Sequence, residues 1–580
     1  MKAAIWDSIW CVDFEFFAPD GETPRPLCVV AHDLVSGRRI HRWLDGTASP
    51  ACPYETGPRD LFVAYYASAE IGCHLALGWE IPTRIVDLHA EFRHATSGLH
   101  TAHGPSLLGA MLHFGLPESV AATEKKEMRE LALRGGPYSE EERRALLVYC
   151  ESDVVALSRL WESMQPQIDM PRALLRGRYM AAAAAVERCG VPVDVAALDA
   201  LRGSWPTIRE ELIRRVDAAY GVFDGSHFVQ SRFAAYLAAR KIPWPATPSG
   251  RLSLSDDTFR AQAALHPEIQ PLRELLTTLS RLKLFNLHVG SDGRNRTLLG
   301  AFRSKTGRNQ PSNTKFIFGP ATWVRFLIRP APGMALAYID YAQQEFAAAA
   351  ALSGDQAMLA AYESGDPYLA FARMAGAVPA DATKKSHAAE RDRFKICALA
   401  VQYGMGAESL AASLNQSPAH ARDLLAQHRR TFPRFWRWVD EVGTTAAMTH
   451  RLRAPFGWQL LVTSDTKPTT LQNWPCQAAG AEMLRFAVMA AVEHGIRVCA
   501  PVHDALLIEA PIEEIEDAVA LTSRLMQEAS RLVLYGTTVL TDAKIIRAPD
   551  RYRDGRGEKI WELLEDLVPA LSPAGTPTCP

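Results

Sequence analysis

The sequence lacks several features that would place it in a simple class of protein. Nowhere among its 580 residues do about 18 apolar residues run without interruption, so it predicts no membrane-spanning helix. The N-terminal residues, MKAAIWDSIWCVDFEF, reach acidic side chains too early for a secretory signal. Lysine and arginine together number 63 against 65 acidic residues, a formal net charge of −2, so any contact with nucleic acid has to come from local basic clusters.

The ten cysteines form no C-x-x-C pair, and no histidine-rich segment lies beside them. This spacing disfavours a structural zinc site, which usually draws on clustered thiol and imidazole ligands. Scattered cysteines in a long chain also fit a reducing cytosol better than a disulfide framework. No internal repeat is visible. We therefore expect a cytoplasmic protein without structural zinc.

Two aspartates stand at the edges of apolar runs that lie far apart in the sequence. Asp340 follows the strand-like run MALAYI just before a helical segment, and Asp504 lies beside His503 between the strand-like runs VCAPV and LLIEA. Either aspartate alone could be a helix cap or a turn residue. Together they could hold two divalent cations, the arrangement that activates a hydroxyl and neutralises pyrophosphate in nucleotidyl transfer.

The segment RDRFKICALAVQYG, between these aspartates, predicts a helix with cationic side chains on one face. Four positions step by four residues, each step advances about 40° around a helix, and all four therefore share about one third of its circumference. They are Arg391, Lys395, Leu399 and Tyr403. A solvated basic stripe would show the same spacing, but residues 396–401 are almost entirely apolar, which favours cations emerging from a packed helix.

A second group of carboxylates lies near the N-terminus. Asp13 and Glu15 alternate along the strand-like run VDFEFF and so face one side. A D-x-E triplet is expected by chance once or twice in about 600 residues. The segment YCESD adds Tyr149 and Asp153, four residues apart on an amphipathic helix and therefore on one face. Together these groups predict a second metal site.

The order of these segments resembles the family A DNA polymerases, the relatives of bacterial DNA polymerase I and their phage and plasmid versions. The resemblance reaches from about residue 10 to about residue 560. DYAQQE is similar to the palm motif that begins with a metal-binding aspartate, RDRFKICALAVQYG to the fingers helix, and VHDA to the second palm motif. The N-terminal motifs resemble proofreading 3′–5′ exonucleases of the DEDDy kind. The resemblance implies a DNA-dependent DNA polymerase with proofreading, for replication or repair in a phage, plasmid or bacterium.

The implied fold is multidomain, α/β and α+β, with a ribonuclease H-like 3′–5′ exonuclease domain followed by a right-hand polymerase domain. The expected boundaries are residues 1–165 for the exonuclease, 166–300 for a connector and thumb, 301–352 and 451–547 for the two parts of the palm, 353–450 for the fingers, and 548–580 for a C-terminal segment with a disordered tail. The sequence lacks a 5′ nuclease domain ahead of the exonuclease, and this favours a phage or plasmid replicase or a degenerate cellular copy.

The resemblance also implies roles for the polymerase residues. Asp340 and Asp504 bind two Mg²⁺ ions, for which Mn²⁺ can substitute. Arg391 and Lys395 bind the triphosphate of the incoming dNTP, and Lys395 protonates the pyrophosphate leaving group. Tyr403 stacks near the templating base.

Other implied roles concern the sugar and the template. Glu345 blocks the ribose 2′-hydroxyl, and His503 lies with its hairpin beneath the primer 3′ end. Leu399 occupies a nucleotide-binding position where the family often has an aromatic residue, and Tyr368 one where it often has a histidine. Arg308, Asn473 and Gln477 contact primer and template through the minor groove, whose acceptors are nearly the same for every base pair.

In the N-terminal domain the resemblance assigns Asp13, Glu15 and Asp153 to two further Mg²⁺ ions and Tyr149 to the attacking water. The fourth carboxylate departs from the family pattern, because the segment VAYYASAEIG has tyrosines where the pattern has His and Asn. Glu70 is the preferred ligand, with Asp87 as the alternative.

Two other functions fit parts of the pattern. A single-subunit phage-type RNA polymerase shares the R-x-x-x-K and Y-G spacing, but Glu345 and the N-terminal motifs argue against it. A catalytically silent scaffold that binds primer-template DNA is disfavoured by retention of the charged residues. The expected partners are primer-template DNA and dNTPs, with no membrane, and the expected state is a monomer that works with accessory replication factors.

Overall fold

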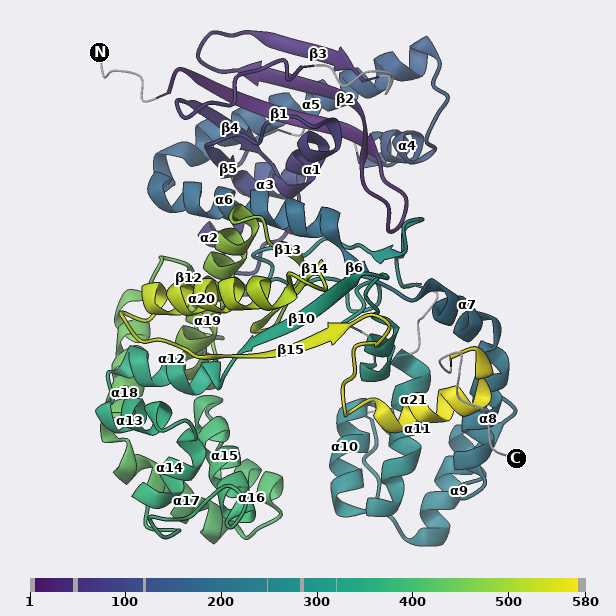
Figure 1. The fold of residues 1–580 in the computed structure, drawn as a ribbon, viewed down its shortest axis with the longest axis vertical. Helices are drawn as coiled ribbons and strands as arrows, with labels where there is room; N and C mark the ends of the chain where they lie inside the picture. The colour runs from purple at the N-terminus through teal and green to yellow at the C-terminus, as the bar shows by residue number, and fades with distance from the viewer. Residues whose placement is uncertain are drawn as a thin grey trace. The chain divides into compact units, whose positions relative to one another are not determined.

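The computed structural model describes residues 6–44, 51–117, 122–247, 249–281, 286–319 and 321–571. The chain divides into two compact units (Figure 1). The first comprises Met1–Gly190, Leu298–Pro311 and Ala335–Ile545, and the second Val191–Thr297, Ser312–Met334 and Ile546–Pro580. Within the described ranges, no helix combines the length and the apolar character needed to cross a bilayer.

The N-terminal part of the first unit is a five-stranded mixed sheet. Its strand order is β3-β2-β1-β4-β5, with antiparallel pairing of β1 to β2 and β2 to β3 and parallel pairing of β1 to β4 and β4 to β5. The strands are β1 (Ser8–Phe17), β2 (Arg25–Asp33), β3 (Arg39–Trp43), β4 (Asp60–Ala64) and β5 (Ile85–Asp87). The helices are α1 (Ser68–Leu77), α2 (Leu88–Ala95), α3 (Leu107–His113), α4 (Ala122–Leu133) and α5 (Glu140–Met164).

Alternation along β1 sends its side chains into two cores. Cys11 packs with Leu146 and Cys150 of α5 in one apolar cluster, whereas Val12 and Phe14 belong to another that includes Ile71 of α1. Because residues two apart on a strand face the same way, Asp13 and Glu15 continue the Cys11 face toward α5.

Helix α6 (Met170–Cys189) belongs to the first unit, although we expected a domain boundary after residue 165. A Cβ atom at Gly177 would lie 1.9 Å from the Ile85 carbonyl oxygen, so only glycine permits this close approach of α6 to β5. Arg176 of α6 also forms a buried ion pair with Glu91, with Nε and Oε1 2.6 Å apart. These contacts attach α6 to the N-terminal sheet.

The second compact unit is mainly helical. Its helices are α7 (Val195–Gly203), α8 (Trp205–Asp217), α9 (Gln230–Arg240), α10 (Asp256–Leu265), α11 (Gln270–Arg281) and α21 (Glu558–Leu567), with 3₁₀ turns at Pro267–Ile269, Thr322–Leu327 and Pro569–Leu571. Its short strands are β6 (Val191–Pro192), β7 (Phe223–Asp224), β8 (His227–Phe228) and β9 (Arg294–Asn295). Asp194 joins distant segments of this unit by pairing with Arg329 at 3.1 Å and Arg551 at 3.2 Å. The expected disordered tail lies mostly outside the described residues, which end at Leu571.

A four-stranded sheet lies in the later part of the chain, with strand order β13-β14-β10-β15. The strands are β10 (Met334–Tyr341), β13 (Arg497–Val502), β14 (Ala505–Pro511) and β15 (Thr541–Arg547). Helix α19 (Pro468–Glu493) packs on β13, α20 (Ile515–Val533) packs on β14, and these two helices pack on each other. Burial alternates along β10, so that Ile339 and Tyr341 are buried while Asp340 between them is only half-buried.

The expected helical insertion follows β10 and α12 (Gln344–Ser353) (Figure 1). It comprises α13 (Gln356–Glu363), α14 (Pro367–Met374), α15 (Ala388–Gln402), α16 (Ala407–Leu414), α17 (Pro418–Thr431) and α18 (Pro433–Thr449). A small hairpin of β11 (Arg451–Arg453) and β12 (Gln459–Leu461) then leads to α19. Phe371 of α14 packs against Phe394 of α15 and against Phe432, the residue between α17 and α18, which gives the insertion its own core.

Candidate functional site

Asp340 and Asp504, far apart in the sequence, lie near each other at one edge of the four-stranded sheet. Asp340 is the penultimate residue of β10, and Asp504 occupies the two-residue turn between β13 and β14. The N–H of Tyr341, the residue after Asp340, donates to the carbonyl oxygen of Asp504 at 3.2 Å, so this hydrogen bond holds the two aspartates near each other. His503 supplies the turn's positive φ, at 57°. The cap alternative for Asp340 is excluded, because the residue that caps α12 is Gln343.

The electrostatics of this pair also indicate close approach. Burial raises the pKa of Asp340 to about 6, and the negative charges of Asp504 and Asp542 add to that rise. Burial likewise raises the pKa of Asp504, against the opposing positive charges of His503 and Arg308. Half-buried carboxylates that disfavour one another's ionised forms are suited to sharing a cation.

Asp542 is a third carboxylate at this place, and the sequence reasoning missed it. The N–H of Ala342 donates to the Leu540 carbonyl at 2.8 Å, and the N–H of Ala548 donates to the Met334 carbonyl at 3.2 Å. Both bonds fit one antiparallel register, and this register sets Asp542 of β15 directly opposite Asp340. Side chains of directly opposed residues point to the same face of a sheet. From the sequence, only a prediction that TDAKIIR pairs with the strand that carries Asp340 could have revealed Asp542.

The helix predicted for RDRFKICALAVQYG is α15, and its cations gather around one tyrosine. Arg391 Cζ lies 5.7 Å and Lys395 Nζ 5.9 Å from the centre of the Tyr368 ring, which α14 supplies. Arg391 Nε donates to Asp366 Oδ2 at 2.5 Å. Leu399 is half-buried one turn further along. The predicted nucleotide-binding residues of α14 and α15 therefore form one basic and aromatic cluster.

Glu345 and Tyr403 meet between α12 and the end of α15. Tyr403 is the C-cap residue of α15, and its hydroxyl donates to Glu345 Oε1 at 2.7 Å. Burial and this hydrogen bond raise the pKa of Tyr403 to about 12, while the positive charge of Arg308 and a hydrogen bond with Gln477 act in the opposite direction. Glu345, Tyr403, Arg308 and Gln477 thus form one connected group.

The loop that carries Arg308 is held from several sides. The indole nitrogens of Trp458 and Trp474 donate to the Lys305 carbonyl at 3.1 and 2.9 Å, and Arg485 Nη1 donates to the Gly307 carbonyl at 2.7 Å. Arg308 Nε is buried without a hydrogen-bond partner among the described residues. A buried donor without a partner is costly unless a ligand satisfies it.

Helix α19 carries the other two predicted minor-groove residues. Asn473 and Gln477 are four residues apart, so they share one helix face, and both are half-buried. Gln472 on the same helix donates from Nε2 to the Val401 carbonyl of α15 at 2.6 Å. This bond fixes α19 beside the end of α15.

The N-terminal sheet brings the second predicted group together. Burial raises the pKa of Glu70 well above its usual range, and the charges of Asp13 and Glu15 add to the effect. The pKa of Tyr149 is also raised, by burial and then by the charges of Asp153, Glu15 and Asp13. All five side chains, from β1, α1 and α5, therefore lie within electrostatic reach of one another.

The structure distinguishes Glu70 from Asp87. The Asp87 carboxylate caps α2 and accepts from the backbone N–H groups of Tyr66, Ala67, His89 and Ala90 at 2.8 to 3.4 Å. In contrast, Glu70 Oε2 is buried without a hydrogen-bond partner in the described part of the chain. Asp87 is thus committed to structure, whereas Glu70 has an oxygen available for a ligand.

Comparison with known proteins first defines the class of fold. A solved structure, the POL domain of Pol1 from M. smegmatis in complex with DNA primer-template and dNTP, matches 94% of this chain and 96% of its own at a TM-score of 0.72 and 17% sequence identity. The chain therefore has the fold of that polymerase domain.

Sequence comparison then shows which proteins the chain is similar to. Residues 309–545 match the family model for DNA polymerase family A, so this part of the chain is similar to that family. The chain is 24% identical over 450 residues to the thermostable DNA polymerase I of Thermus thermophilus, covering 72% of this chain and 51% of the relative. It is 24% identical over 416 residues to the DNA polymerase of Mycobacterium phage D29, covering 67% of this chain and 66% of the relative. The chain thus spans about half to two thirds of these relatives' lengths.

Proposed function

We propose that this protein is a DNA-dependent DNA polymerase that adds dNTPs to a primer 3′ end. The observation that carries the proposal is that Asp340 and Asp504 lie close together. The N–H of Tyr341, the residue after Asp340, donates to the carbonyl oxygen of Asp504. The two aspartate carboxylates offer the hard oxygen ligands that Mg²⁺ prefers. The pKa of Asp340 is raised by burial and then by repulsion from Asp504 and Asp542, and a bound cation would oppose both effects. Mg²⁺ bound by these two residues would lower the pKa of the primer hydroxyl and neutralise the leaving pyrophosphate.

The chain's own residues orient the nucleotide. Lys395 is exposed near the Tyr368 ring and can donate a proton to the leaving pyrophosphate, while Arg391, held by Asp366, presents its remaining guanidinium N–H groups to the triphosphate. Leu399 on the next turn contacts the sugar.

The Glu345 carboxylate, held by the Tyr403 hydroxyl, excludes a ribose 2′-hydroxyl. Arg308, Asn473 and Gln477 bind the minor groove of the primer-template and check base-pair geometry without reading sequence. Charge-assisted contacts of Arg308 are favoured because its buried Nε needs a partner.

Primer extension tests this proposal. Asp340→Ala and Asp504→Ala should abolish extension while binding of labelled primer-template, measured by fluorescence anisotropy, is retained. Asp517→Ala, an exposed carboxylate on α20, is the matched control and should extend normally. Wild-type protein that binds DNA but never extends it would instead support a scaffold, and preferential use of NTPs would support an RNA polymerase.

We also propose a second activity, 3′–5′ proofreading, in the N-terminal domain. The supporting observation is the convergence of Asp13, Glu15, Glu70, Asp153 and Tyr149. The mixed sheet order β3-β2-β1-β4-β5 supports the ribonuclease H-like assignment. The four carboxylates suit two Mg²⁺ ions that would activate a water, and Tyr149 would orient that water.

Removal of a mismatched 3′ nucleotide tests the second activity. Asp13→Ala should abolish removal while leaving extension from a matched primer unchanged. Glu127→Ala, an exposed carboxylate on α4, serves as the control. Undiminished excision by Asp13→Ala would contradict the assignment.

A further inference from the structure

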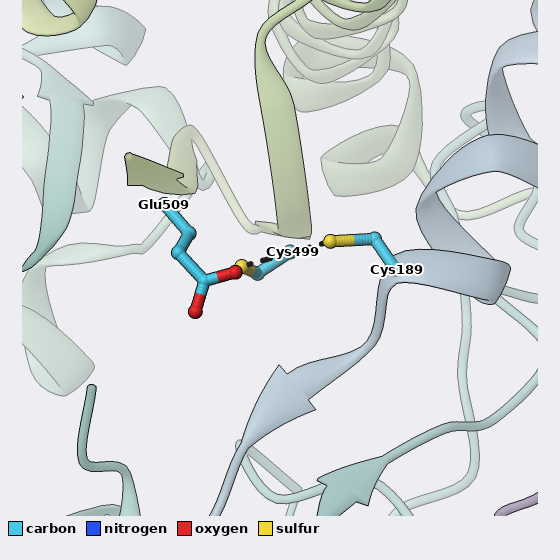
Figure 2. A group of neighbouring side chains, drawn as sticks. All are labelled: Cys189, Cys499 and Glu509. Carbon is cyan, nitrogen blue, oxygen red and sulfur yellow. Dashed lines mark hydrogen bonds between the residues drawn. The ribbon is translucent and has the colours of Figure 1, made fainter. Parts of the chain in front are cut away.

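Two thiols and a carboxylate from distant segments meet at the β13–β14 hairpin (Figure 2). Cys189 is the last residue of α6, Cys499 lies on β13, and Glu509 lies on β14. The sulfur atoms of the two cysteines are 3.9 Å apart, and one ligand atom from each of the three residues lies within 4.8 Å of the others. All three belong to the first compact unit.

The strand geometry brings Cys499 to this position. In the β13–β14 ladder Arg497 is opposite Glu509 and Val498 is opposite Ile508, but the register then moves on to Ala500, so that Cys499 has no opposite residue. Cys499 stands two residues after Arg497, so it shares the face of the strand on which Arg497 lies opposite Glu509.

Burial distinguishes this cluster from a surface group of polar residues. Cys499 is 3% exposed, and the Glu509 side chain is 1% exposed. Cys189 is half-buried, so the cluster has one side open to water. An ionised carboxylate buried this deeply is costly unless charges or hydrogen bonds compensate it.

The local charges suit a divalent cation. Arg497 Nη2 lies 2.8 Å from Glu509 Oε2, so a cationic side chain already faces this carboxylate. Two thiolates and one carboxylate carry three negative charges, and a divalent cation with Arg497 would balance them completely. Arg497 would also orient the carboxylate, the role that residues contacting metal ligands commonly have.

We propose that Cys189, Cys499 and Glu509 bind a zinc ion, with water as the fourth ligand. Two sulfurs bound to tetrahedral zinc at 2.3 Å lie about 3.8 Å apart, close to the separation of these two thiols. Binding releases both thiol protons to solvent, and the thiolate lone pairs form the bonds to zinc. The ion joins the end of α6 to the base of the hairpin whose turn carries Asp504. Our expectation of no structural zinc considered only ligands close together in the sequence, whereas Cys189 and Cys499 are 310 residues apart.

Metal binding tests the proposal directly and does not depend on polymerase activity. Under reducing conditions, with excess Mg²⁺ to occupy oxygen-rich carboxylate sites, wild-type protein should bind one Zn²⁺ in competition with a chromophoric chelator. Co²⁺ in its place should give the sulfur-to-cobalt charge-transfer absorption of thiolate ligation. Cys499→Ser and Glu509→Gln should each weaken Zn²⁺ binding by more than about tenfold, since loss even of a residue that supports a ligand costs that much.

Matched variants keep the test independent of folding. Cys189→Ser should lose the charge-transfer band and is the primary variant, because its half-buried site tolerates a hydroxyl. Cys52→Ser, another half-buried cysteine of the same unit, should bind like wild type. The Zn²⁺-dependent increase in melting temperature should be present in wild type and Cys52→Ser and absent in Cys189→Ser.

Three outcomes would overturn the proposal. The first is wild-type protein that takes up no Zn²⁺ under these conditions. The second is the same affinity in Cys189→Ser as in wild type. The third is a pair of thiols that forms a disulfide under mild oxidation, seen as loss of two hydrogens by mass spectrometry, with no Zn²⁺ binding when reduced.

Discussion

The two carboxylate clusters of this chain are built from different elements, and their surroundings differ accordingly. The cluster of Asp340, Asp504 and Asp542 lies at the ends of adjacent strands, where its members are half-buried or exposed. The N-terminal cluster joins one strand to two helices and includes Glu70, which is 4% exposed. The carboxylates of the first cluster are thus accessible to solvent, whereas the second contains a buried carboxyl whose pKa is raised well above its usual range.

This difference has a consequence for stability. A buried carboxyl with an oxygen that lacks a hydrogen-bond partner destabilises the metal-free fold and is relieved by a cation. A strand-end pair disturbs the fold less, because water still reaches its carboxylates. We therefore expect metal binding to be coupled to folding more strongly at the N-terminal cluster than at the cluster of Asp340, Asp504 and Asp542.

The largest expected effect is the loss of one activity while the other stays unchanged. Asp504→Asn should lower the rate of extension about a thousandfold, because a metal ion contributes several kcal/mol to the transition state and each 1.36 kcal/mol is tenfold in rate. Excision of a mismatched nucleotide should not change. Glu15→Asn should give the reverse result. Rapid-quench assays of both reactions on one primer measure this, and parallel loss of both activities would show that the clusters act as one site.

A second expected effect has opposite signs for function and stability. Glu70→Gln should reduce excision about a hundredfold by removing a ligand, yet stabilise the metal-free protein above about pH 4.5. The raised pKa of Glu70 means that the folded state holds its proton more tightly than the unfolded state, so the wild-type stabilisation is complete at low pH and is lost as the pH rises. Chemical denaturation at several pH values, with and without Mg²⁺, measures the difference. Equal stability of the two proteins at pH 8 would contradict the account.

Much of this site was predictable, because local patterns specify local elements. The run MALAYI predicted a strand that ends at Asp340, one residue short of the observed end at Tyr341, and the four-residue spacing placed Arg391 and Lys395 on one face of a helix, where both lie near the Tyr368 ring. Asp542 could not be found in this way. Its partner lies about 200 residues earlier, and only the register of β10 with β15 brings them together.

The thiol cluster was not found from the sequence for the same reason, because only long-range packing brings its residues together. Zinc patterns are recognised from ligands spaced closely in the sequence, but Cys189, at the end of α6, and Cys499, on β13, meet only because α6 packs on β13. The preference for Glu70 over Asp87 was made from the sequence, and the four backbone N–H groups that occupy Asp87 support it. Asp542 and the thiol cluster, in contrast, depend on long-range register and packing and not on local propensity.

The pH dependence of extension should sharpen the comparison. With an Asp340 pKa of about 6 in the metal-free protein, protons compete with Mg²⁺ below that pH, so extension at limiting Mg²⁺ should fall up to about tenfold per pH unit. Saturating Mg²⁺ should shift the fall to lower pH. Metal-free stability should also decrease between about pH 4 and 6, because the folded pKa lies above the unfolded one. A profile that does not move with Mg²⁺ concentration would exclude Asp340 as its source.

A smaller effect concerns the sugar. Tyr403→Phe should raise ribonucleotide insertion relative to dNTP insertion about fivefold, which corresponds to about 1 kcal/mol, because the Glu345 carboxylate loses the hydroxyl that holds it at 2.7 Å. Glu345→Ala should raise insertion further, since the carboxylate itself is removed. Single-nucleotide incorporation with each substrate measures both. A larger effect from Tyr403→Phe than from Glu345→Ala would place the steric barrier on the tyrosine.

The smallest expected effect tests whether Asp542 belongs to the strand-end cluster. Its charge opposes ionisation of Asp340 but would attract Mg²⁺, so Asp542→Asn should act in opposite directions at different pH values. At pH 8, where Asp340 is already ionised, the Mg²⁺ concentration needed for half-maximal extension should rise about threefold. Near pH 5.5 the loss of attraction is offset, because Asp340 gives up its proton more readily without the opposing charge. Asp517→Asn, remote on α20, should show neither change. An Asp542→Asn effect of the same size at both pH values would mean that Asp542 does not act through Asp340.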